Sequence, residues 1–166
     1  MKALLAGLVI LCAAFNAPAE DLVVVGASSS LQASGFLSYV EPLLKTRTGL
    51  SVEWKVAGNA QVIQLARARE VDAIFVDSSE AENLVREGVG AMMLRVMAAG
   101  PQEQFSIIAL NPGAGRMPRF DAALRVLRWL TSTEGQGVIG RFSRGGVVPY
   151  QPNAGTETCP ACQAQL

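Results

Sequence analysis

The chain has 166 residues and 50% of them are hydrophobic, so it is long enough to bury one core and is expected to form a single domain. Basic and acidic residues balance at 14 each, and aromatic residues make up only 6% of the chain. This composition argues against a nucleic-acid-binding surface, which needs an excess of positive charge and often aromatic stacking. The absence of histidine excludes His-dependent triads and His general acid–base catalysis.

The first residues have the pattern of a secretion signal. Lys2 supplies the positive end, and the apolar stretch at residues 3–15 is too short to span a bilayer as a helix. Ala17, Pro18 and Ala19 form a small-residue cleavage site. We therefore predict a signal peptide at residues 1–19, cleavage near Ala19 and a periplasmic mature protein.

Residues 22–43 predict a strand, a turn and a helix. The apolar run at 22–25 stops at Gly26, and helical apolar spacing begins at Phe36. Between them stand Ser28, Ser29 and Ser30. The first amides of a helix lack intrahelical partners and favour negative charge, and a serine can either cap them or donate to a ligand. Both readings remain open at this stage: an anion site, or a capped helix with solvated serines.

Two further strand–turn–helix units follow. Strands are predicted at 50–56 and 71–76, and helices at about 62–69 and 77–87, with Gly58 and Asn59 in the first turn. Repeated β–turn–α units with right-handed crossovers predict an α/β fold, with a doubly wound, mostly parallel sheet and helices on both faces.

The second half is predicted to contain strands at 92–98 and 105–110 and helices at 120–130 and 134–142. Thr131 and Glu134 have the spacing of a capping box for the last helix. From Gly145 the chain is rich in Gly, Pro and polar residues, which predicts a loop or tail. We therefore expect one α/β lobe at 20–145 and a tail at 146–166.

Three turns are expected to meet at the carboxyl edge of the parallel strands. None of them contains Lys or Arg, so they offer a neutral set of hydrogen-bond donors, which suits a fully ionised tetrahedral oxyanion. The candidate ligand-binding residues are Ser28, Ser29, Ser30, Gly58, Asn59 and Ser78. The alternative is three ordinary capped helices. No nucleophile–base pair is visible, so an enzyme is not expected, and no metal or cofactor is implied.

The segment VGASSSLQASGFL and the later segments VAGNAQVIQLARAREVDAIFVDSSEAENL, FSIIALNP and RVLRWLTSTEGQGVIGRF resemble tungstate/molybdate-type periplasmic binding proteins of ABC importers. The shared features are the hydroxyl run, an S-x-Q-x-S-G pattern, the Gly-rich second turn and an EAE helix. The resemblance implies a periplasmic-binding-protein type II fold and a ligand such as tungstate, molybdate or sulfate. It also implies an ABC permease as partner and ligand contacts from the serine run, with a weaker role for Gly58 and Asn59.

Two departures from that family bear on function. The family's second lobe, expected between Gly90 and Met92, has no counterpart, so the anion would stay hydrated and bind weakly unless a homodimer closed the site. Asp77 would repel an oxyanion unless it capped the next helix, which is the role we expect. The alternative function is a protein-interaction or sensory module that kept the scaffold without transport.

The last residues contain a CxxC motif, Cys159 to Cys162. Redox catalysis by such a motif uses a helix start to lower the thiol pKa, and only four residues follow Cys162. In an oxidising compartment we therefore expect a local disulfide rather than a catalytic thiol or a metal site.

Overall fold

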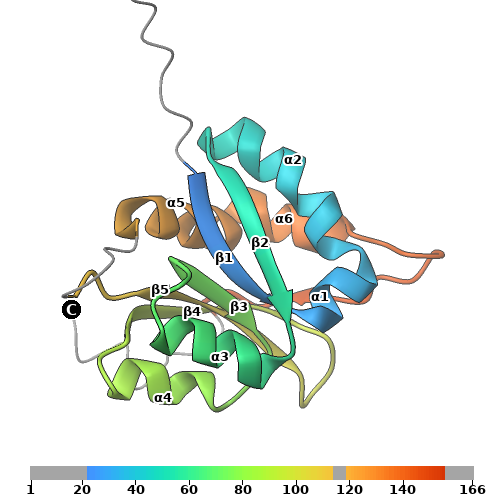
Figure 1. Cartoon of the computed structure of the whole chain (residues 1–166). Helices are drawn as coiled ribbons and strands as arrows, with labels where there is room; N and C mark the ends of the chain where they lie inside the picture. Colours follow the sequence, from blue (N-terminus) through green and yellow to red (C-terminus); the bar gives the residue numbers. More distant parts are fainter. Residues whose placement is uncertain (1–21, 114–118, 156–166) are drawn as a thin grey trace, which may run out of the picture.

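The computed structural model describes residues 22–113 and 119–155, which form a six-stranded sheet in the order β2-β1-β3-β5-β4-β6, with helices packed against it (Figure 1). The strands are β1 (Leu22–Ser28), β2 (Ser51–Ala57), β3 (Ala73–Val76), β4 (Gly90–Ala98), β5 (Gln104–Leu110) and β6 (Gln151–Pro152). The helices are α1 (Ser29–Ser34), α2 (Phe36–Thr48), α3 (Asn59–Arg67), α4 (Ala81–Arg86), α5 (Phe120–Thr131) and α6 (Thr133–Arg141).

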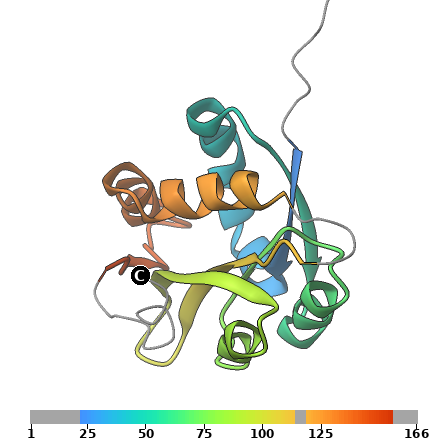
Figure 2. The ribbon, with the colours of Figure 1, turned by 90° about the vertical axis from the view of Figure 1, so that its left-hand side faces the viewer.

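The predicted α/β fold class is confirmed. Strands β1, β2 and β3 are parallel, while β5 pairs antiparallel with both β3 and β4. Strand β4 therefore points the same way as the first three strands, and β6 runs antiparallel to it. Helices α3 and α4 cover one face, and α1, α2, α5 and α6 cover the other (Figures 1 and 2). Among the described helices, none combines the length and the apolar character that crossing a membrane requires.

Strand β1 is buried on both faces, and its residues are almost all apolar or small. The sequence suggested that the strand ends at Gly26. In the structure Gly26 lies within the strand. A Cβ atom at Gly26 would stand 2.9 Å from Cγ1 of Val62 on α3 and 3.3 Å from Cγ2 of Ile74. The glycine is therefore needed for close helix–sheet packing, and the strand continues to Ser28.

The start of α6 differs from the predicted capping box. Ser132 is the N-cap, and its Oγ accepts from the Gly135 amide at 3.1 Å. Thr131 instead donates its hydroxyl back to the Leu127 carbonyl at 2.9 Å. Glu134 forms an ion pair with Arg47 of α2 at 2.8 Å. The predicted Thr131 cap is thus wrong, because Thr131 already belongs to α5 and Ser132 is the residue with extended backbone.

The segment after Gly145 is not simply a loop. Tyr150 is only 4% exposed and packs against Phe36, Phe105 and Phe142. The next two residues form β6, paired with Met97 and Ala98 of β4. Burial of the Tyr150 ring brings this segment back to the sheet, an interaction between residues far apart in the chain.

Strand β4 runs from Gly90 to Ala98, with local irregularities in its pairing to β5 between Gly90 and Met92 and between Arg95 and Met97. The point at which the second lobe was expected is therefore the interior of a continuous strand. The predicted signal peptide and the two cysteines, Cys159 and Cys162, lie outside the described residues.

Candidate functional site

The strand register places the three candidate turns at one edge of the sheet. Ser28, the last residue of β1, pairs with Ala57, the last residue of β2, so Gly58 follows directly beside it. On the other side Ala27 pairs with Phe75, and β3 ends one residue later. The turn containing Asp77 and Ser78 therefore begins at the same edge. This is the arrangement expected of parallel strands, whose carboxyl ends share one edge.

Ser28 lies at the centre of this edge. It is 3% exposed, and its Oγ lies 2.6 Å from Oγ of Ser30 and accepts weakly from the Ser30 amide at 3.4 Å. Ser28 is thus the N-cap of α1, while Ser29 and Ser30 are exposed at the start of that helix. The serine run therefore combines one buried capping residue with two exposed serines, of which Ser30 is hydrogen-bonded to Ser28.

The second turn also offers unpaired polar groups. Gly58 is the N-cap position of α3 and provides no side-chain cap, so the first amides of that helix have no side-chain acceptor there. The Oδ1 atom of Asn59 is buried and has no hydrogen-bond partner among the described residues. A side-chain amide carries both an acceptor and donors, and this unpaired Oδ1 is an acceptor at the edge.

The third turn differs from the prediction. Ser78 accepts the Glu80 amide at 3.2 Å, and α4 begins only at Ala81. Asp77 does not cap α4, because the N-cap position is Glu80; the Oδ1 of Asp77 is buried with no hydrogen-bond partner among the described residues. The carboxylate therefore remains as an unneutralised acceptor at an edge otherwise supplied with hydroxyls and amides.

Tyr150 joins this edge from the far end of the chain. Burial raises the pKa of its hydroxyl, a hydrogen bond with Ser34 lowers it, and the negative charges of Asp77 and Glu103 raise it further. The hydrogen bond with Ser34 places this hydroxyl beside the last residue of α1. Sequence analysis missed Tyr150, although the apolar run at 147–150 within a polar tail was an available signal.

A cavity of about 530 Å³ lies at the same edge, where β4 ends and β5 begins. Its lining comprises Ala98, Ala99, Gly100, Pro101, Gln104, Val148, Pro149 and Gln151. Val148 is 50% exposed, and the adjoining Val147 is 65% exposed. The Arg144 guanidinium donates to the Ala33 carbonyl of α1 and so fastens this loop beside the serine run.

Comparison with solved structures finds the same fold in several proteins, two of which are described by their association with tungstate. A tungstate binding protein, TupA, from Desulfovibrio alaskensis G20 has a TM-score of 0.75 and 14% identity, over 81% of this chain and 99% of that chain. A tungstate ABC transporter structure from Geobacter sulfurreducens has a TM-score of 0.66 and 14% identity, over 73% and 98%. A functionally unknown protein from Vibrio parahaemolyticus has a TM-score of 0.64 and 13% identity, over 71% and 97%.

No protein-family model matches the chain, and no curated protein matches it in sequence. At these identities the structural likeness establishes the fold and leaves the ligand open. The roles of Ser28, Ser29, Ser30, Gly58, Asn59 and Ser78 as ligand contacts therefore stay predictions.

Proposed function

We propose that this protein is an exported solute-binding protein that binds a small oxyanion at the carboxyl edge of β1, β2 and β3 and works with an ABC importer. The observation that carries the proposal is the position of Ser28. Its hydroxyl ends the central parallel strand between the other two turns, directly before the amides of α1. Likeness to two tungstate-associated structures supports the same class of ligand.

The expected affinity is low. Ser29 and Ser30 are exposed, so hydrogen bonds made there compete with water. Each such bond contributes about 0.5–1.5 kcal/mol, and four or five of them, less the association penalty of several kcal/mol, correspond to about millimolar binding at best. A second copy of the chain covering this edge would exclude water and strengthen binding.

Asp77 affects which oxyanion is accepted. Its carboxylate lies one residue beyond β3 and repels a fully ionised anion more than one that retains a proton. A proton on the anion can also donate to the unpaired Oδ1. We therefore propose that hydrogen phosphate binds at least as well as molybdate, tungstate or sulfate.

Thermal unfolding with and without each anion tests the proposal. At ten times Kd a ligand stabilises the folded state by about 1.4 kcal/mol, which raises Tm by about 3–6 °C in a domain of this size. Chloride at equal ionic strength is the control for general salt effects. Ser29→Ala is expected to reduce the shift, because Ser29 is exposed at the start of α1.

Ser38→Ala is the matched control variant, since Ser38 is an exposed serine in the first turn of α2 and is not among the proposed ligand contacts. It is expected to keep the full shift. A shift that is absent for all four oxyanions, or equal in Ser29→Ala and Ser38→Ala, would contradict the proposed site.

A further inference from the structure

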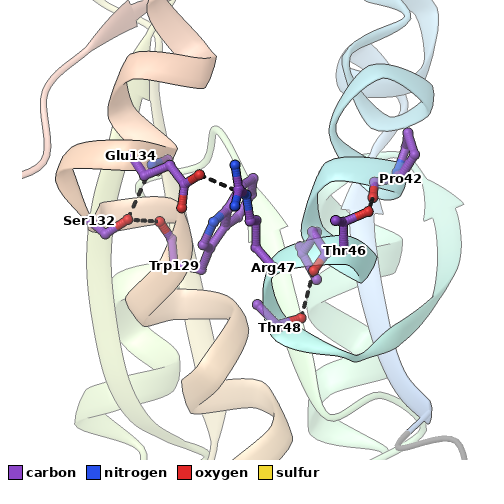
Figure 3. A network of polar contacts seen from close by, with 9 residues as sticks. Pro42, Thr46, Arg47, Thr48, Trp129, Ser132 and Glu134 are labelled. Carbon is purple, nitrogen blue, oxygen red and sulfur yellow. Dashed lines mark hydrogen bonds and ion pairs between the residues drawn. The ribbon is translucent and has the colours of Figure 1, made fainter.

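A second cavity, of about 290 Å³, lies between α2, α5 and α6, on the helices and not at the edge that carries the serine run. Its lining comprises Tyr39, Leu43, Arg47, Trp129, Glu134, Val138 and Arg141. Figure 3 shows Arg47 reaching from α2 toward Glu134 on α6, with Trp129 on the α5 side. No part of the proposed oxyanion site uses these residues.

The cavity follows from the spacing of side chains on two helices. On α2, Tyr39, Leu43 and Arg47 recur every four residues and so share one face. The Tyr39 hydroxyl donates to the Val138 carbonyl of α6 at 3.3 Å, and this hydrogen bond connects the two helices at one end. The Arg47–Glu134 ion pair, 2.8 Å between Nε and Oε1, ties them at the other.

Trp129 provides an unpartnered donor in this wall. The residue is 8% exposed, and its Nε1 is buried with no hydrogen-bond partner among the described residues. An indole N–H can only donate, so the group that would satisfy it must bring an acceptor. Buried donors are nearly always paired in native proteins, which makes this nitrogen a marker for an absent acceptor.

The charge of the lining also favours an acceptor that is negative. Arg47 and Arg141 stand against one carboxylate, Glu134, which leaves an excess of one positive charge. The Arg141 side chain folds back along α6 toward Gly137. A Cβ atom placed on Gly137 would lie only 3.2 Å from Nη1 of Arg141. No ion pair of Arg141 is found among the described residues, so its charge is available to a ligand.

We propose that this cavity binds a small organic monocarboxylate. One carboxylate oxygen accepts from Trp129 Nε1, and the charge is balanced by Arg141. The short hydrocarbon part of the ligand packs on Leu43 and Val138. Because Nε1 has no accessible surface, the lining side chains must shift as the ligand enters. Arg47 is 58% exposed and shifts within the site, where it stays paired with Glu134 and keeps that carboxylate from facing the ligand without a counter-charge. The volume of about 290 Å³ lies at the lower end of the range for small-molecule pockets, which favours a small ligand.

Tryptophan fluorescence tests the proposal. The full chain contains two tryptophans, Trp54 and Trp129, so Trp54→Phe leaves Trp129 as the single reporter. Sodium butyrate is the probe, and butanol and butylammonium chloride at matched ionic strength are controls for apolar and ionic effects. We expect a saturable change in emission with butyrate that neither control produces.

Variants then separate the proposed contacts from general effects. In the Trp54→Phe background, Arg141→Gln is expected to weaken butyrate binding about threefold to tenfold, which corresponds to the loss of one charge-assisted contact. Arg128→Gln, an exposed arginine on α5 outside the lining, is the matched control and is expected to bind as the parent does. Trp129→Phe, followed by calorimetry, removes the N–H and is expected to weaken binding about threefold or more.

A non-saturable response to butyrate, or equal responses to butyrate and butanol, would overturn the proposal. So would equal butyrate affinity in Arg141→Gln and Arg128→Gln. Full affinity in Trp129→Phe would show that the indole N–H is not a ligand contact, which also contradicts the site as proposed. These outcomes do not depend on the oxyanion site, because no residue is shared.

Discussion

Replacing Asp72 with alanine is expected to destabilise the fold strongly, because this buried carboxylate connects two parts of the chain that are distant in sequence. The side chain is 4% exposed. Its Oδ2 accepts from the Val24 amide of β1 at 2.8 Å, and its Oδ1 accepts from the Arg119 amide before α5, also at 2.8 Å. The Asp72 carboxylate thus holds the amide of Arg119, the N-cap residue of α5, and at the same time holds the Val24 amide of β1.

The magnitude follows from the two donors left behind. An unsatisfied buried donor costs about 1–3 kcal/mol, and the Val24 amide is fully buried. The Arg119 amide is only partly buried, so water can replace the lost oxygen at a cost of about 1 kcal/mol, near that of a lost helix cap. Asp72→Ala is therefore expected to lower the free energy of unfolding by about 2–4 kcal/mol.

Two further variants sharpen this test. Asp72→Asn keeps one acceptor oxygen and is expected to cost about half as much as Asp72→Ala. Asp121→Ala removes an exposed acidic residue from the first turn of α5 and is expected to cost less than about 1 kcal/mol. Urea unfolding followed by circular dichroism measures all three. A loss below about 1 kcal/mol in Asp72→Ala, or an equal loss in Asp121→Ala, would refute the assigned role.

Three other predictions follow from single contacts. Gly26→Ala is expected to destabilise the fold by about 1–3 kcal/mol in urea unfolding, because the new methyl group meets Val62 at 2.9 Å, whereas Gly58→Ala meets nothing within 4 Å and should cost far less. Asp77→Asn is expected to strengthen molybdate binding at least about threefold in calorimetry by removing a repulsive charge; unchanged binding would show that the carboxylate does not face the anion. Because folding raises the pKa of Tyr150, the unfolded chain ionises first, so stability should be retained below the ordinary value of 10.0 and fall as pH rises above it. Tyr150→Phe should remove that part of the pH dependence, and an identical alkaline profile in the variant would refute it.

The order of strands and helices was predictable because it depends on local signals. Apolar runs and helical spacing act within a few residues of one another, and the structure places Gly49 and Gly88 at positive φ at the ends of α2 and α4. The convergence of the three turns was predictable for the same reason, since parallel β–α units place every such turn at one edge.

The details of that edge were not predictable in the same way. Asp77 has the sequence context of a helix cap, yet Ser78 makes the turn and the carboxylate oxygen stays unpaired. Whether a side chain caps depends on backbone angles and competing neighbours, and these are set once the turn packs against the rest of the domain.

The sequence alone therefore determined the α/β class, the serine run and its place before a helix, because periodicity and capping chemistry are encoded in neighbouring residues. Only the tertiary structure decided that Tyr150 and β6 return to the sheet, that Asp72 joins β1 to α5, and that Trp129 lines a cavity with Arg47 and Arg141. Each of these features joins residues distant in the chain, and burial of apolar surface, not local propensity, brings them together.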